Sequence, residues 1–186
     1  MSSARTTVEV VVEVAVGVTA GVTAWTFAEY WLHRGPMHRP GGRDPLASEH
    51  RAHHVDPAAT SPSARTAGVI GVAVLGRVVT APLRRRRRAL GEGVALGWGL
   101  GYAAYDRLHW NVHHRPPSDA ADTRRLRHLD HHVNPRRNFG VTTAVWDRCF
   151  GTHVVPEVVR LPRRLTPTWA ADDPDALDRL VTVGGR

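Results

Sequence analysis

Histidine has the most unusual distribution of any residue type in this sequence. Twelve His occur among 186 residues, and eleven of them fall in three stretches, 33–54, 109–114 and 128–132. Imidazoles packed together repel one another when protonated, and they are costly to bury without partners. A metal ion removes both problems because His binds it in the neutral form. We therefore expect the clusters to meet at a metal site.

The spacing inside each cluster indicates which His share a helix face. Side chains three and four residues apart lie on one face of an α-helix. His33 and His38 do not fit that spacing, and Gly35 and Pro36 predict that a helix ends between them. Three other sets do fit it: His50, His53 and His54; His109 and His113; and His128, His131 and His132.

The number of clustered His indicates more than one ion. His153 stands alone and is predicted not to be a ligand, and His114 lies off the face that carries His113, so its role stays open. Ten His remain. One tetrahedral zinc takes at most four ligands, so ten predict two metal ions with about five ligands each. Imidazole suits several transition metals, and the ligand set alone does not name the metal.

Four carboxylates adjoin these motifs in sequence: Glu49, Asp106, Asp130 and Asp147. A metal-bound His usually donates its second ring N–H to such an acceptor. Each of the four is therefore either an acceptor for a ligand His or a solvated charge.

Three apolar stretches must position the motifs, at about residues 8–32, 66–84 and 89–108. Each approaches the roughly 20 residues that a bilayer-spanning helix needs. We predict an all-α fold: a short integral-membrane helical domain with about three to four membrane helices and a cytosolic His-rich helical cap. It covers residues 1–155, and a C-terminal tail follows at 156–186.

The first stretch has an alternative interpretation as a secretory signal peptide, which Glu9 and Glu13 disfavour because they interrupt its apolar region. Glycines recur four residues apart at 17 and 21 and again at 93, 97 and 101. Such spacing lets helices approach closely in lipid. Six aromatic side chains near the ends of the stretches are either an interfacial belt or packing residues: Trp25, Trp31, Trp98, Tyr102, Tyr105 and Trp110.

The charge distribution predicts an orientation in the membrane. The segment 66–108 contains no His and is long enough to cross a bilayer and return, with Arg84–Arg88 at the far tip. Eighteen Arg then lie on the His side and six on the other. We therefore expect the His to face the cytoplasm. The expected location is a bacterial inner membrane. The five-Arg tip opposes the bias.

Composition excludes several other classes. One Cys rules out a disulfide framework or an iron–sulfur cluster held by this chain alone. The net charge is +8 and every basic residue is Arg, but apolar stretches flank the run Arg84–Arg88. We therefore expect contacts with lipid phosphates there and no nucleic-acid partner.

The His motifs and their surroundings resemble the fatty acid hydroxylase superfamily of membrane di-iron oxygenases, which includes sterol desaturases and methyl oxidases. The similar segments are Glu29–His33, Gly101–Pro117, His128–His132 and Asn138–Thr152, and the fatty acid hydroxylase branch is the most similar. The family's metal ligands correspond here to His33, His38, His50, His53, His54, His109, His113, His128, His131 and His132.

The resemblance implies a membrane-bound di-iron oxygenase that hydroxylates an acyl chain of a fatty acid or lipid with O2. Its cofactors would be two Fe ions, with zinc possible in recombinant samples. Electrons would come from a separate donor, ferredoxin or a cytochrome b5-like protein with its reductase. Carotenoid hydroxylation, sterol-type desaturation or methyl oxidation is the alternative within the superfamily. A non-catalytic metal-binding membrane protein is the alternative outside it.

Overall fold

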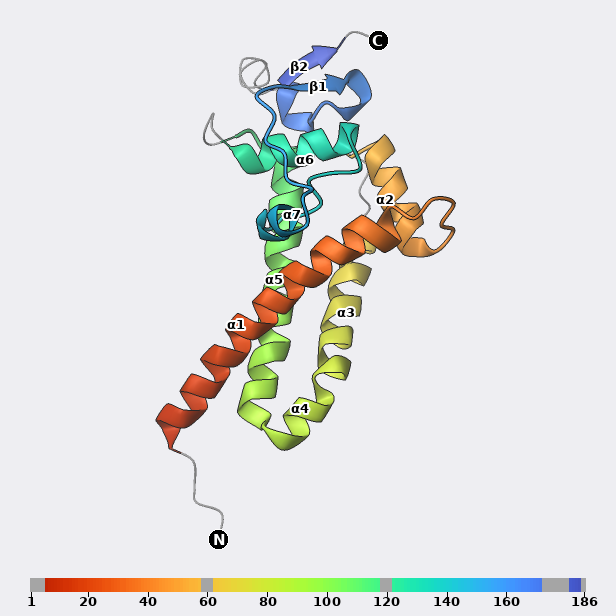
Figure 1. The fold of residues 1–186 in the computed structure, drawn as a ribbon. Helices are drawn as coiled ribbons and strands as arrows, with labels where there is room; N and C mark the ends of the chain where they lie inside the picture. Colours follow the sequence, from red (N-terminus) through yellow and green to blue (C-terminus); the bar gives the residue numbers. More distant parts are fainter. Residues whose placement is uncertain (1–5, 58–61, 118–121, 172–180, 185–186) are drawn as a thin grey trace. The chain divides into compact units, whose positions relative to one another are not determined.

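The structure is a computed structural model that describes residues 6–57, 62–117, 122–171 and 181–184, and it is mainly helical (Figure 1). The elements in chain order are α1 (Thr7–Leu32), the π-helical turn η1 (His33–Met37), α2 (Pro45–Val55), α3 (Pro62–Val79), α4 (Ala81–Arg86), α5 (Arg88–His114), α6 (Thr123–Val133), α7 (Val145–Cys149), β1 (Val159–Pro162), the 3-10 turns η2 (Arg163–Leu165) and η3 (Thr168–Ala171), and β2 (Val181–Gly184).

The predicted helical class is confirmed, with one addition in the segment after Pro156. There β1 and β2 pair as a two-stranded parallel sheet, in register from Val159 opposite Val181 to Pro162 opposite Gly184. The expected boundary between a domain at 1–155 and a tail at 156–186 stays a prediction.

The chain divides into two compact units. We call residues 1–28 and 61–105 the hairpin unit, and residues 29–60 and 106–186 the histidine unit. Helices α1 and α5 each contribute residues to both, because the divisions fall within them.

In the hairpin unit, the glycine spacing allows α1 and α5 to pack with their backbones close together. A Cβ on Gly17 would collide with the Leu90 carbonyl oxygen, and a Cβ on Gly21 would collide with that of Val94. Gly97 meets Val18 in the same way. These contacts confirm the helix-packing role expected from the four-residue spacing.

Aromatic side chains fill the interior of the same unit. Trp25 is only 3% exposed, and its ring meets those of Trp98 and Tyr102 edge to face at 5.3 and 5.1 Å. Such edge-to-face pairs add to the stability gained by burial alone. Trp25 is therefore a packing residue, and for this residue the belt interpretation was wrong.

The outer surface of the hairpin unit is apolar. Large aliphatic side chains are about half exposed on α1 and α3, among them Val11, Val16, Ile70 and Val74. Among the described residues, the run Thr7–Met37 is the one helix long and apolar enough to cross a bilayer by itself. The count of three to four membrane helices therefore stays a prediction.

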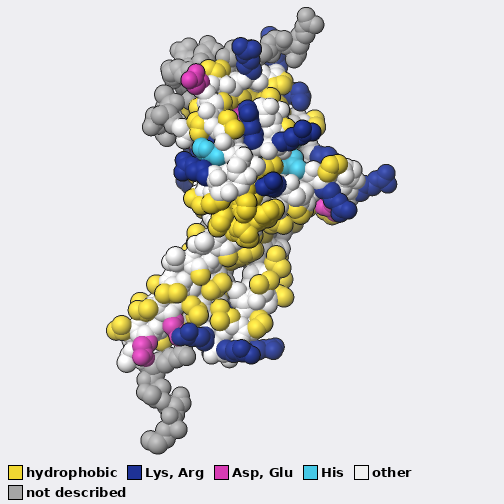
Figure 2. Space-filling model, in the orientation of Figure 1, with side chains coloured by type: hydrophobic (Ala, Val, Ile, Leu, Met, Phe, Trp, Pro, Cys, Tyr) yellow, Lys and Arg dark blue, Asp and Glu magenta, His cyan; other side chains and the backbone are white. Residues whose placement is uncertain are grey.

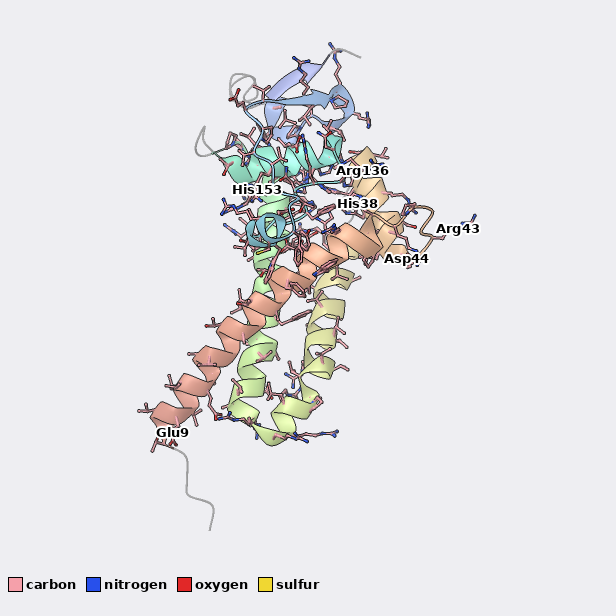
Figure 3. The ribbon with its side chains drawn as sticks, in the orientation of Figure 1. Glu9, His38, Arg43, Asp44, Arg136 and His153 are labelled. Carbon is pink, nitrogen blue, oxygen red and sulfur yellow. The ribbon has the colours of Figure 1, made fainter. Side chains whose placement is uncertain are left out.

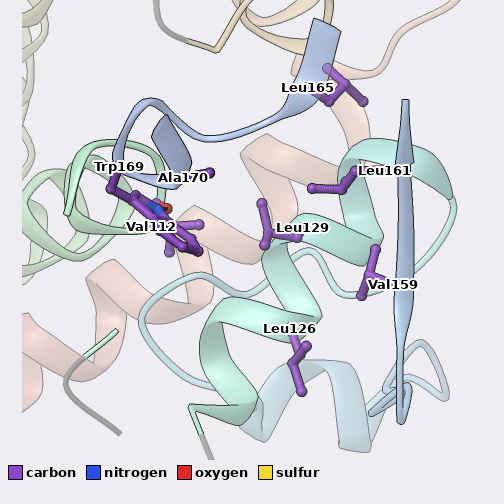
Figure 4. Close-up of a cluster of buried hydrophobic side chains, with 8 residues drawn as sticks. All are labelled: Val112, Leu126, Leu129, Val159, Leu161, Leu165, Trp169 and Ala170. Atoms are coloured by element: carbon purple, nitrogen blue, oxygen red, sulfur yellow. Dashed lines mark hydrogen bonds between the residues drawn. The ribbon is translucent and has the colours of Figure 1, made fainter. Parts of the chain in front are cut away.

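In the histidine unit, α6 packs its apolar side chains on the segment after Pro156 (Figure 4). Trp169 is 2% exposed and donates its indole N–H to the Val112 carbonyl oxygen at the end of α5. Thr168 donates to the His113 carbonyl oxygen. The chain after Pro156 therefore holds the end of α5 and packs against α6, two helices that carry His. The buried cluster comprises Val112, Leu126, Leu129, Val159, Leu161, Leu165, Trp169 and Ala170.

Candidate metal centre

The π-helical turn η1 brings the first two His of the chain together. We expected a helix end between His33 and His38, but α1 instead continues as a π-helix through Met37 with Pro36 inside it. A π-helix places residues i and i+5 on one face. The two imidazole rings consequently stack with their centroids 5.2 Å apart.

Helix α2 divides its three His between two places. His50 and His54 are four residues apart, and their rings lie 4.6 Å from each other. His53 lies 6.2 Å from both and meets His109 of α5 at 4.4 Å instead. The i, i+4 pair therefore points one way and the middle His the other.

Helix α6 repeats this division in the opposite sense. His128 and His132 lie 4.8 Å apart and contact His113 of α5. His131 turns away from them toward His33, at 4.3 Å. Each helix therefore supplies two His to one cluster and one His to the other.

The structure thus gathers all ten His singled out in the sequence into two groups of five. Within each group the ligand atoms lie within 4.8 Å of one another. The two groups adjoin, since the rings of His54 and His132 stack at 4.4 Å. Group A is His33, His38, His50, His54 and His131, and group B is His53, His109, His113, His128 and His132.

The ring nitrogens in these groups fit a metal better than they fit hydrogen bonds to each other. The Nε2 of His38 lies 2.9 Å from the Nε2 atoms of both His50 and His131. The Nε2 of His128 likewise lies 3.0 and 3.1 Å from those of His113 and His132. A ring nitrogen has a single in-plane hydrogen or lone pair, so it cannot form two good hydrogen bonds. A shared cation would satisfy all of the converging lone pairs.

Burial keeps these imidazoles neutral. Loss of solvation, together with the neighbouring His, lowers the pKa of His53 to about 3 and that of His54 to about 4. The same causes lower the pKa of His128 and His132 well below the ordinary value. Because the neutral ring is the form that binds metal, the protein holds its candidate ligands ready.

Backbone carbonyl oxygens accept the second ring N–H of two group A residues. His33 donates from Nδ1 to the Phe139 carbonyl oxygen, and His131 donates from Nδ1 to that of Arg137 at 2.7 Å. A carbonyl can only accept, so both rings carry the proton on Nδ1 and present the Nε2 lone pair to the group. In group B, the Nδ1 atoms of His113, His128 and His132 are buried without a hydrogen-bond partner among the described residues.

Two of the carboxylates expected to accept these protons bind the neighbouring loop instead of the His. Asp147 accepts from the backbone N–H groups of Phe139 and Gly140, both at 2.8 Å. Asp130 accepts from the side chains of Arg137 and Asn138. Our expectation for these two carboxylates was therefore wrong: they fix the loop whose carbonyl oxygens accept from the ligand His.

Glu49 lies on the outside of the histidine unit. It follows the N-terminal turn of α2 and its side chain is exposed. For Glu49, the solvated-charge interpretation is the one that fits.

Glu29 is a structural residue that the His spacing did not point to. It is 4% exposed, and its carboxylate accepts from the backbone N–H groups of Val141 and Thr142 and from the Thr142 hydroxyl. Glu29 lies on α1 one turn before His33, so it ties the helix that carries this ligand to the loop that carries its acceptor. The signal was present, since Glu29 belongs to the first motif and Val141 to the last.

Loop 137–143 has an unusual backbone at Asn138, where φ is 58°. Asn tolerates this left-handed conformation better than most residues. The Asn138 side chain is 1% exposed, and it donates to Asp130 and accepts from the Val154 N–H. These bonds hold the residue that immediately precedes the Phe139 acceptor.

The remaining two His lie outside both groups. His114 stacks on Trp110 with ring centroids 3.6 Å apart, and its Nδ1 lies near the Thr168 hydroxyl. His153 belongs to neither group; Figure 3 labels it together with the group A residue His38. The structure therefore gathers neither of the two with the candidate ligands.

Comparison with known proteins places this arrangement in a family. The family model for fatty acid hydroxylases matches residues 18–152, which include all ten grouped His. The chain belongs to the fatty acid hydroxylase family. The described bonds of Glu29, Asp130 and Asp147 all lie among residues inside the matched segment or at its end.

Curated relatives are fatty acid 2-hydroxylases. The human fatty acid 2-hydroxylase is 31% identical over 146 residues, which are 72% of this chain and 38% of the relative. The protein of Macaca fascicularis with the same name matches equally. The dihydroceramide fatty acyl 2-hydroxylase of Arabidopsis thaliana is 29% identical over 140 residues, or 69% of this chain and 56% of the relative. The chain thus spans between about two fifths and three fifths of their length. No solved structure matches significantly.

Proposed function

We propose that this protein is a membrane-bound oxygenase that hydroxylates position 2 of a fatty acyl chain, as a free acid or within a lipid. The observation that carries the proposal is the pair of five-His groups in a chain of the fatty acid hydroxylase family. The activities for which the relatives are named, fatty acid 2-hydroxylation and dihydroceramide fatty acyl 2-hydroxylation, suggest the position.

The ten grouped His are the proposed ligands of two iron ions, group A for one and group B for the other. When bound, such a pair would supply the activation of O2 and the insertion of one oxygen atom into a C–H bond. We infer iron from the family resemblance and not from the ligands, because imidazole also binds zinc. Zinc in a recombinant sample would therefore say little about the working metal.

The protein's own contribution is to hold these imidazoles neutral, oriented and away from water. His33 and His131 donate their Nδ1–H groups to carbonyl oxygens, which directs the Nε2 lone pairs inward. The buried carboxylates of Glu29, Asp130 and Asp147 keep those carbonyls in place. Fixed ring orientation raises metal affinity and limits rearrangement during a reaction cycle.

The setting that we propose is a membrane, with the His groups facing the cytoplasm of a bacterial cell. The exposed aliphatic side chains of α1 and α3 support a lipid environment, and acyl lipids would then be the abundant substrate. Residues 8–32, 66–84 and 89–108 are the proposed membrane helices. Electrons would come from a separate protein, either a ferredoxin or a cytochrome b5-like donor with its reductase.

Analysis of cellular lipids tests the reaction. Cells that express the full chain should accumulate 2-hydroxy fatty acids, and labelled O2 should supply the hydroxyl oxygen. The variant His113→Ala should abolish this product, whereas His153→Ala should retain it. Hydroxylated carotenoids or desaturated sterols in place of 2-hydroxy acids would contradict the proposal, as would full activity of His113→Ala.

Cysteine labelling tests the orientation. Cys149 is exposed in the histidine unit and serves as a natural reporter for the His side. In a Cys149→Ser background, Ala89→Cys reports the opposite side. An impermeant thiol reagent should label Ala89→Cys in intact cells and Cys149 only after the cells are opened. Labelling of both in intact cells would disprove the proposed helical hairpin.

A further inference from the structure

The five consecutive Arg of the hairpin unit have different surroundings. Arg87 pairs with Glu13 of α1 at 3.0 Å, and Arg84 pairs with Glu92 of α5 at 3.1 Å. The side chains of Arg85, Arg86 and Arg88 have no ion pair or hydrogen bond among the described residues. The sequence shows one uniform basic run, but the fold divides it into paired and unpaired members.

The backbone at this end of the unit is well defined. The Thr80 hydroxyl donates to the Gly76 carbonyl oxygen, and α4 begins at Ala81 with Pro82 in its first turn. A Cβ on Gly91 would approach the Arg84 backbone to within 2.7 Å, so α4 packs directly on α5. The Arg side chains are therefore mounted on a compact turn rather than on an extended loop.

An open surface pocket of about 400 Å³, called the cavity below, lies among the ends of α3, α4 and α5, and it is strongly basic. The residues that line it are Arg77, Ala81, Arg84, Arg85, Arg88 and Glu92. Glu92 is the one carboxylate among them, and it contacts both Arg77 and Arg84. Within this lining, the positive charges of Arg85 and Arg88 are left without a counter-charge. Arg86 belongs to the same run but does not line the cavity.

An exposed apolar surface adjoins this cavity. On α3, Val74 lies three residues before the lining residue Arg77 and four residues before Val78, so these residues share one side of the helix. Val74, Val78 and Val79 are 55%, 64% and 67% exposed. The space-filling view shows basic side chains gathered at the end of the unit that carries α4, with hydrophobic side chains next to them (Figure 2).

We propose that this cavity binds the phosphate headgroup of an anionic phospholipid, whose acyl chains lie along the exposed face of α3. Guanidinium groups bind phosphate oxygens through paired, charge-assisted hydrogen bonds. Arg85 and Arg88 provide two guanidinium groups that no described residue pairs, and Arg77 and Arg84 are already oriented by Glu92. The aliphatic side chains of α3 provide the surface that a free phosphate ion would not use. This site is separate from the His groups and does not depend on the proposed reaction.

The proposal also accounts for the position of the Arg run in a membrane protein. A bound anionic headgroup neutralises cations next to the hydrocarbon, where unpaired charge is expensive. Basic pockets between membrane helices bind anionic lipid headgroups in other proteins. A bound headgroup would therefore explain why Arg84–Arg88 can lie on the side of the membrane opposite to the one that the charge bias favours for Arg.

Lipid titration of the full-length protein in uncharged detergent provides the test. Native mass spectrometry and thermal unfolding would be followed during addition of phosphatidylglycerol, phosphatidylcholine or inorganic phosphate. We expect phosphatidylglycerol to bind and to raise the unfolding temperature, while the other two do neither at equal concentration. The double variant Arg85→Gln/Arg88→Gln should weaken phosphatidylglycerol binding by about tenfold or more. Since no described residue pairs with either Arg, this variant should fold normally.

Arg86→Gln is the matched control, because it removes one charge from the same run outside the cavity. It should change binding by less than about twofold. The single variants Arg85→Gln and Arg88→Gln complete the comparison. If Arg86→Gln weakened phosphatidylglycerol binding as much as either of them, the attraction would be diffuse and the proposal would be overturned. Competition by inorganic phosphate, or equal binding of phosphatidylcholine, would overturn it as well.

Discussion

The two units of this protein differ in the polar side chains that they bury. Among the described residues, the buried polar and charged side chains belong to the histidine unit except for Thr80, whose hydroxyl is satisfied by the Gly76 carbonyl oxygen. In the hairpin unit, glycines and aromatic rings lie inside, and Val, Leu and Ile face outward. The histidine unit therefore buries polar groups beside its apolar cluster, whereas the hairpin unit has an apolar exterior.

This difference shows what stabilises each unit. In a lipid, helices gain little hydrophobic free energy by packing apolar surfaces against each other, so close backbone packing at glycines stabilises them instead. The histidine unit buries six imidazoles and three carboxylates, and each of these groups needs a partner. The hydrogen bonds of Asp130, Asp147 and Glu29 satisfy the carboxylates. A metal would satisfy the converging imidazoles.

Removal of metal should therefore affect the two units very differently. Chelation should raise amide hydrogen exchange in α2 and α6 by about 100-fold or more, since a ligand held at 100 times its Kd contributes about 2.7 kcal/mol. Residues 66–100 of the hairpin unit should exchange at nearly unchanged rates. Hydrogen-exchange mass spectrometry before and after chelation measures both.

Re-addition of Fe(II) should restore protection in α2 and α6. A protein that lost metal without any change in exchange at His50 or His131 would contradict the view that metal satisfies the interior of the histidine unit. Equal loosening of both units would show that the two do not differ in this respect.

The second largest effect should come from Asp147→Asn. The amide loses the negative charge that holds the N–H groups of Phe139 and Gly140, at a cost of about 1–3 kcal/mol. The His33 acceptor then becomes less well fixed, and metal affinity should fall by about 10–100-fold. Metal content after dialysis against a series of chelator concentrations gives this number. Glu157→Gln, an exposed change of the same kind, should leave metal affinity unaltered.

The smallest effect on the metal centre should come from a change in the packing of the hairpin unit. Gly21→Leu places a side chain against the backbone at Val94 and should destabilise the protein by about 1–3 kcal/mol. Metal affinity should stay the same, because Gly21 lies outside the histidine unit. Thermal unfolding and metal content, measured on one sample, separate the two effects.

Gly71→Ala serves as the control for this substitution. A Cβ at Gly71 meets nothing within 4 Å, and Ala favours a helix over Gly by about 0.5–1 kcal/mol. This variant should therefore be slightly more stable than the original. Destabilisation by Gly71→Ala as large as that caused by Gly21→Leu would show that close packing at Gly21 is not what matters.

Much of the candidate centre could be predicted from local spacing. The i, i+4 pairs His50/His54 and His128/His132 each share a group, as their spacing indicates. The assignment of the middle residues, His53 and His131, to the opposite groups could not be predicted. It depends on where α5 and the end of α1 lie around each helix, and nothing in the spacing records this.

The structure of residues 33–38, which carry the first two His, also could not be predicted from local sequence. Gly35 and Pro36 are ordinary signals for a helix end, yet the chain forms a π-helical turn there. The turn is less favourable locally than an α-helix, so its neighbours must hold it. The His33 bond to Phe139 and the His38 contact with His131 bridge about a hundred residues of chain, and only the tertiary fold brings them together.

The sequence by itself determined the chemistry that is available: ten clustered His, three apolar stretches, glycines at packing spacing and one basic run. These are properties of residue type and of helical period, which act over a few residues. Tertiary structure alone decided which His meet, which carbonyls orient them, and which Arg of the run are paired. Those choices depend on side chains that are distant in the chain but share a buried space, where every polar atom must find a partner.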